Sequence, residues 1–91
     1  MKVRYTKAAL RQLGAILSYI AEHSPQGAQN VQARLGRLMA ALETQPLIGA
    51  RTNKPGVRRA VAAPYPYIVL YEVRGDEIII RAVRHGARKE H

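Results

Sequence analysis

The sequence contains no cysteine, so a disulfide framework is excluded and a reducing compartment, the cytoplasm, is expected. Its three histidines, His23, His85 and His91, are scattered along the chain, and we therefore predict neither a metal site nor a cofactor. No apolar run approaches the ~20 residues that a membrane-spanning helix needs. No signal-peptide-like stretch follows Met1, so we expect no contact with a membrane.

Acidic side chains are also scarce. Six Asp and Glu residues stand against fifteen Lys and Arg, which gives a net charge of +9. In so small a chain this excess indicates a polyanionic partner, either nucleic acid, a nucleic-acid-bound machine or an acidic protein, although high charge also serves solubility alone. The arginines gather in the second half, at Arg51, Arg58, Arg59, Arg74, Arg81, Arg84 and Arg88.

With 91 residues, 47% of them hydrophobic, the chain is long enough for one small core, and we predict a single domain over residues 1–91. Residues 2–5 are expected to form a short strand, and Thr6 to cap a helix that ends near His23. Ser24 is expected to cap a second helix that runs to about Thr44. Gly14 and Gly36 lie inside these helices, and we expect a close approach of another element to offset their cost.

Residues 64–88 carry the strongest strand signal. Apolar and polar residues alternate from Tyr67 to Val73, which is typical of a strand with two different faces, and Gly75-Asp76 is a two-residue turn. The predicted register gives the first face the pairs Val73–Ile78, Tyr71–Ile80 and Val69–Ala82. It gives the second face the pairs Glu72–Ile79, Leu70–Arg81 and Ile68–Val83.

Residues 46–56 read as a loop, and residues 57–61 as a strand that leads into this hairpin. The resulting order, β-α-α-β-β-β, predicts an α+β fold in which a helical hairpin packs on a small, mainly antiparallel sheet. The helices cover one sheet face. The second face is apolar and carries Arg81, so it is either a docking surface for a partner segment or a solvated face.

The residues give only weak evidence for catalysis. Metal-free RNA cleavage needs a base, an acid and cations around the phosphorane. His85 lies at the end of a predicted strand with arginines expected nearby, but no acid partner is identified. The competing interpretation is that His85 orders the C-terminal turn by hydrogen bonding.

Several segments in order resemble the RelE/ParE superfamily of bacterial toxin–antitoxin toxins, and the ParE branch in particular. They are Ser24-Pro25 between two helices, residues 46–49 (PLIG), residues 57–59 (VRR), residues 67–71 (YIVLY) and residues 85–88 (HGAR). The resemblance spans almost the whole chain and implies the RelE/ParE-like fold.

The two branches differ in activity. RelE-type toxins cut mRNA on the ribosome, and their catalytic arginine corresponds by position to Ile68. A second arginine corresponds to a position at or near Gly86, and their C-terminal tyrosine has no counterpart after Val83. An isoleucine cannot stabilise a phosphorane, so the sequence departs from the nuclease pattern where the chemistry would lie.

ParE-like toxins instead bind DNA gyrase and trap its covalent complex with DNA, which is inhibition by binding rather than enzyme activity. The resemblance implies an acidic ParD-like antitoxin, through which alone the toxin would reach operator DNA. On this basis we expect a target-binding set and an antitoxin-binding set. The target-binding set is Arg58, Arg59, Arg81, Arg84, His85 and Arg88. The antitoxin-binding set is Ile68, Leu70 and Val83. The alternatives are a ribosome-dependent mRNA endonuclease of RelE type and a binding module without toxicity.

Overall fold

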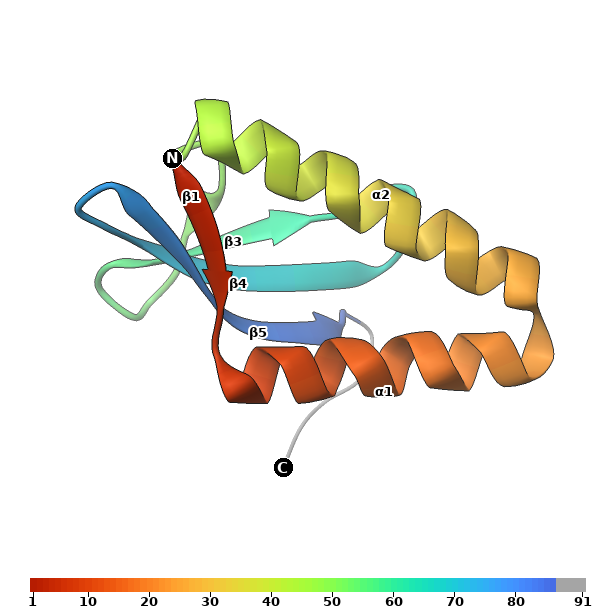
Figure 1. Ribbon diagram of the computed structural model, residues 1–91. Coiled ribbons are helices and arrows are strands. Elements are labelled where there is room, and N and C mark those ends of the chain that lie inside the picture. The colour runs from red at the N-terminus through yellow and green to blue at the C-terminus, as the bar shows by residue number, and fades with distance from the viewer. Residues whose placement is uncertain (87–91) are drawn as a thin grey trace.

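The computed structural model describes residues 1–86 and contains two helices and a five-stranded sheet (Figure 1). In chain order the elements are β1 (Lys2–Tyr5), α1 (Lys7–His23), α2 (Pro25–Thr44), β2 (Ala50–Arg51), β3 (Val57–Val61), β4 (Tyr67–Arg74) and β5 (Glu77–His85). The strand order is β1-β5-β4-β3-β2. Only β1 pairs in parallel, with β5, and every other pair is antiparallel. The predicted α+β class and helical hairpin are confirmed.

Two side chains fix the helix boundaries as predicted. Thr6 accepts a hydrogen bond from the Ala9 amide at the start of α1. Ser24 serves both helices, because its backbone amide donates to the Ile20 carbonyl at 2.7 Å and its Oγ accepts from the Gly27 amide at 2.9 Å. Each contact satisfies a backbone group that a helix end leaves without an intrahelical partner. One residue therefore joins α1 to α2.

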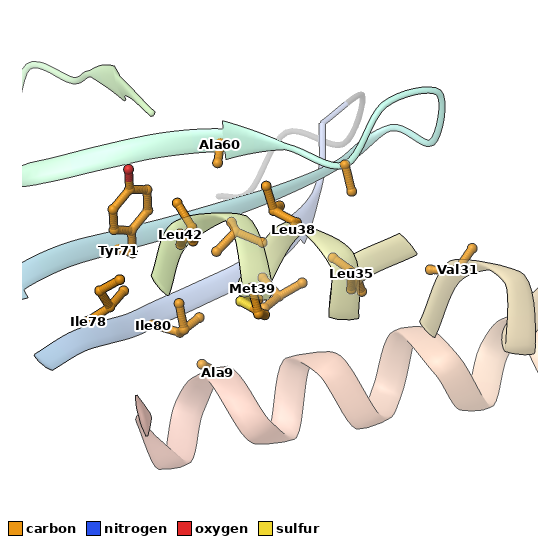
Figure 2. Close-up of a cluster of buried hydrophobic side chains, with 13 residues drawn as sticks. Ala9, Val31, Leu35, Leu38, Met39, Leu42, Ala60, Tyr71, Ile78 and Ile80 are labelled. Carbon is orange, nitrogen blue, oxygen red and sulfur yellow. The ribbon is translucent and has the colours of Figure 1, made fainter. Parts of the chain in front are cut away.

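The core lies between the helical hairpin and one face of the sheet (Figure 2). Tyr71, Ile78 and Ile80 are fully buried and contribute the sheet's side of this cluster. On the helices, the buried residues are Ala9, Val31, Leu35, Leu38, Met39 and Leu42. Burial also raises the pKa of Tyr5, which packs against this cluster from β1. Because all of these side chains are on one side, the opposite sheet face is left without a helix.

The β4–β5 register agrees with the prediction near the turn and departs from it further on. Val73 lies opposite Ile78 and Tyr71 opposite Ile80, as expected, but the pairing then shifts by one residue between Leu70 and Tyr71. Leu70 therefore pairs with Ala82, and Val69 with Val83. Arg81 is the extra residue and forms a β-bulge. Each residue of β5 after the bulge therefore lies on the opposite sheet face from the one it would have in an unbroken ladder.

Two other expectations are corrected. Residues 46–56 are not loop throughout, because Ala50–Arg51 forms the edge strand β2 against β3. Gly14 and Gly36 are not sites of close approach, since a Cβ added at either would meet nothing within 4 Å. Their cost to the helices is thus not offset by packing. No helix within residues 1–86 is long and apolar enough to cross a membrane.

Candidate functional site

The sheet face that lies away from the helices, called here the uncovered face, carries apolar side chains surrounded by arginines. Its pairs across β3, β4 and β5 follow from the register: Val61 beside Ile68, Arg59 beside Leu70, and Leu70 beside Ala82. The apolar members are Val57, Val61, Ile68, Leu70, Ile79 and Ala82. Val57, Ile79 and Ala82 are only 6–7% exposed, yet none belongs to the core cluster under the helices.

A single carboxylate organises the charge on this face. Glu72 Oε1 lies 2.6 Å from Arg74 Nε, and its Oε2 lies 3.4 Å from Arg81 Nη1. The Glu72 side chain is only 13% exposed, whereas those of Arg74 and Arg81 are 72% and 42% exposed. Arg81 reaches Glu72 from the bulge on the neighbouring strand β5. The pair holds Arg81 in place while leaving much of its side chain accessible.

Ile68 lies at the end of the uncovered face, directly opposite Arg84 on β5. The chain then turns back over it, because the Gly86 amide donates a hydrogen bond to the Pro66 carbonyl at 2.6 Å. A Cβ at Gly86 would lie 3.1 Å from Ile68 Cδ1, so the glycine sits in close contact with the isoleucine. The two positions at which the RelE-type pattern has arginines are therefore neighbours here, and they hold an isoleucine and a glycine.

The expected position of Val83 is wrong. It was assigned to the second face with Ile68, but it lies opposite Val69, is 1% exposed and belongs to the core cluster. The bulge at Arg81 is the cause, because it turns Val83 inward and Ala82 outward. Ile68 and Leu70 remain on the uncovered face and are each partly exposed.

The expected target-binding set does not form one cluster. Arg59, Arg81 and Arg84 share the uncovered face, but Arg58 points to the other side of β3, because neighbouring residues of a strand alternate between faces. Arg58 Nη1 donates to the Leu47 and Gly49 carbonyls at 3.2 and 2.8 Å. Arg88 lies outside the described residues.

His85, like Arg58, lies on the helix side of the sheet. It lines a cavity of about 250 Å³ together with Tyr67 of β4 and with Ala15, Ile16 and Tyr19 of α1. Its ring meets that of Tyr67 edge to face, with centroids 5.4 Å apart. No carboxylate lines this cavity within residues 1–86. His85 therefore does not share a sheet face with Arg59, Arg81 and Arg84, although Arg84 directly precedes it in the chain.

A second basic cluster was not anticipated. Arg51 of β2 lies opposite Arg58 of β3, and the turn between them carries Lys54. The sequence did hold a signal for it, since residues 44–71 contain four Lys and Arg but no Asp or Glu. No group of His, Cys, Asp or Glu within residues 1–86 could hold a metal ion.

The comparisons with known proteins bear on this arrangement of a helical hairpin over a basic sheet. Residues 3–90 match the family model described as ParE toxin of type II toxin-antitoxin system, parDE. The chain belongs to this ParE toxin family. It is therefore a toxin of a type II toxin–antitoxin system.

Similar proteins of known sequence agree with this assignment. The chain is 35% identical over 85 residues to "Putative toxin Y4kP" of Sinorhizobium fredii, a match that covers 93% of this chain and 88% of the relative. It is 36% identical over 87 residues to "Toxin RelE2" of Caulobacter vibrioides, covering 96% and 97%. A solved structure titled "Chromosomal ParDE TA system from P. aeruginosa" shares the fold, with a TM-score of 0.79, 24% identity, and coverage of 93% and 95%.

Proposed function

We propose that this ParE-family toxin inhibits DNA gyrase by binding, traps the gyrase–DNA cleavage complex, and is neutralised by an acidic ParD-like antitoxin. The observation that carries the proposal is the contact between Ile68 and Gly86. A nuclease of RelE type would need cations at these two positions to stabilise the charge of a phosphorane. An isoleucine packed on a glycine supplies none.

What the uncovered face offers instead is a surface suited to binding. Partly exposed apolar side chains, Ile68 and Leu70, lie among Arg59, Arg81 and Arg84. Interfaces commonly combine an apolar centre with a charged rim, and arginine is enriched in them. We assign Arg59, Arg81 and Arg84 to the gyrase contact.

The antitoxin would use the same face. An amphipathic acidic segment could place apolar side chains on Ile68, Leu70 and Val61, the last of which is 40% exposed, while its carboxylates meet the surrounding arginines. Overlap of the two contacts explains neutralisation simply, because a bound antitoxin would exclude gyrase.

The test is a supercoiling assay with purified toxin and gyrase. We expect inhibition, accumulation of cleaved DNA, and relief of both by the cognate antitoxin. Arg59→Ala/Arg84→Ala should weaken inhibition at least tenfold, whereas Arg37→Ala, which removes an exposed charge from α2, should not. Unimpaired supercoiling at a large molar excess of folded toxin would refute the proposal.

One observation favours the RelE-type alternative. Arg84 lies directly opposite Ile68, so a cation is present beside the position of the missing arginine. Primer extension on translated message distinguishes the two functions. Site-specific cuts that disappear in Arg84→Ala or His85→Ala would favour the endonuclease, while uncut message together with inhibited gyrase favours the toxin that acts by binding. Normal growth after induction without the antitoxin would indicate a binding module without toxicity.

A further inference from the structure

The turn of the β2–β3 hairpin lines a basic cavity that borders the uncovered face at Val57. The cavity has a volume of about 340 Å³ and is lined by residues 51, 52 and 54–58. Three of these residues, Arg51, Lys54 and Arg58, are cations, and none is acidic. None of the residues that line this cavity belongs to the proposed gyrase contact (Arg59, Arg81 and Arg84) or to the proposed antitoxin contact (Val61, Ile68 and Leu70).

The hairpin is held in one conformation by its own hydrogen bonds. Thr52 Oγ1 accepts from the Lys54 amide at 3.2 Å and donates to the Val57 carbonyl at 2.9 Å, and the Val57 amide donates to the Lys54 carbonyl at 3.1 Å. Gly56 has φ +82°, a left-handed conformation that favours glycine. Lys54 thus projects from a constrained turn rather than from a flexible loop.

Arg58 is fixed as well, by the Leu47 and Gly49 carbonyls that accept from its Nη1. Because Arg51 lies directly across from it, two like charges face each other over the β2–β3 pair, an arrangement that is unfavourable by itself. The three ion pairs within residues 1–86 involve Arg4, Arg74 and Arg81, so no carboxylate of this part of the chain neutralises the hairpin.

We infer that the cavity formed by Arg51, Lys54 and Arg58 binds a phosphate of the DNA backbone. This rests on the proposed function, in which the toxin acts on a complex that contains duplex DNA. The hairpin would add a direct contact with that DNA to the contact that the uncovered face makes with gyrase. An anion between Arg51 and Arg58 would remove their mutual repulsion.

The lining favours phosphate over an acidic peptide. Contacts to DNA phosphates come largely from Arg and Lys, and this hairpin offers Arg51, Lys54 and Arg58. A peptide interface commonly adds an accessible apolar anchor to its arginines. The apolar lining residues are Pro55, which is small, and Val57, which is 7% exposed and therefore mostly unavailable.

The experiment measures binding of a fluorescein-labelled 16-base-pair duplex to purified toxin by anisotropy, without gyrase, between 50 and 200 mM salt. Arg51→Gln/Lys54→Gln should weaken binding roughly ten- to hundredfold at 50 mM and lower the slope of log K against log salt by about 2, because each phosphate contact contributes about 0.9. The matched control, Lys7→Gln/Arg11→Gln, removes two exposed charges from α1 and should change the slope by less than half as much.

Equal losses of DNA affinity in the two double variants would overturn the proposed phosphate site, because they would show that binding responds to net charge alone. Tighter hairpin-dependent binding of a single-stranded RNA 16-mer would overturn the assignment to DNA. Stronger hairpin-dependent binding of a Glu-rich peptide would identify an acidic protein as the ligand instead. Equal unfolding midpoints for the variants and the unmutated toxin establish that folding is intact. Since gyrase is absent, the result is independent of the supercoiling assay.

Discussion

The hydroxyl of Tyr71, on the central strand β4, bridges two backbone groups of the segment that follows α2: it accepts from the Gly49 amide at 2.9 Å and donates to the Pro46 carbonyl at 2.8 Å. Tyr71 itself is completely buried. This one side chain therefore ties residues 46–49 to the core. Arg58 of the β2–β3 hairpin donates to two carbonyls of the same segment. The position of this hairpin therefore depends on how residues 46–49 are held.

Replacing Tyr71 with phenylalanine should destabilise the fold by about 1–3 kcal/mol, because the Gly49 amide would lose its partner in a buried place. Urea denaturation followed by circular dichroism measures the change. Tyr65→Phe is the control, since Tyr65 is only partly buried, and should have a much smaller effect. A difference of less than 0.5 kcal/mol between the two variants, on the order of experimental scatter, would contradict the role given to the Tyr71 hydroxyl.

Gly49→Ala tests the same contact from the other side. A Cβ at this position would lie 2.6 Å from Tyr71 Oη and 3.0 Å from the Arg59 carbonyl oxygen, and neither is free to move. The expected loss of stability is about 1–3 kcal/mol, as for other overpacked buried sites. Thermal unfolding measures it, and an unchanged midpoint would show that the segment relaxes without cost.

The helical glycines should respond in the opposite direction. Gly14→Ala and Gly36→Ala place a methyl group where nothing lies within 4 Å, so each should stabilise the toxin by about 0.5–1 kcal/mol through the higher helix propensity of alanine. The two sites lie on different helices, and the double variant should show the sum. Destabilisation by either change would indicate a contact that the structure lacks.

Substitutions at Val83 and Ile68 should distinguish an effect on folding from an effect on antitoxin binding. Val83→Ala removes two methyl groups from the core and should cost about 2 kcal/mol of stability without directly altering the uncovered face. Ile68→Ala should cost less stability but weaken antitoxin binding measured by calorimetry. If Val83→Ala alone weakened binding while the fold stayed intact, the assignment of the uncovered face to the antitoxin would be wrong.

Local signals were sufficient for the elements that depend on neighbouring residues. Thr6, Ser24 and Pro25 predict both helix starts, because caps act within one turn of the chain. The alternation from Tyr67 to Val73 likewise predicts β4 and the register next to the turn. These features could be read from the sequence because their causes lie within a few residues.

The bulge at Arg81 could not be predicted in this way. Its neighbours Ile80, Ala82 and Val83 are all apolar, so the sequence pattern is compatible with either face after residue 81, and only packing against α1 selects one. The same shift changed the candidate sites, since it buried Val83 and moved His85 to the face opposite Arg81. The hairpin was missed because β2 has only two residues, too few for an alternation to be seen.

The strand order has a consequence for synthesis. β5 lies between β1 and β4, although the ribosome makes it after every other strand of the sheet. In a nascent chain that has not yet produced residues 77–85, β1 has no strand to pair with. The helical hairpin also lacks β5, the strand against which α1 packs. Polypeptides cut short before that point should therefore be harmless and quickly degraded, so that poisoning of the cell requires translation to reach the end of the sheet.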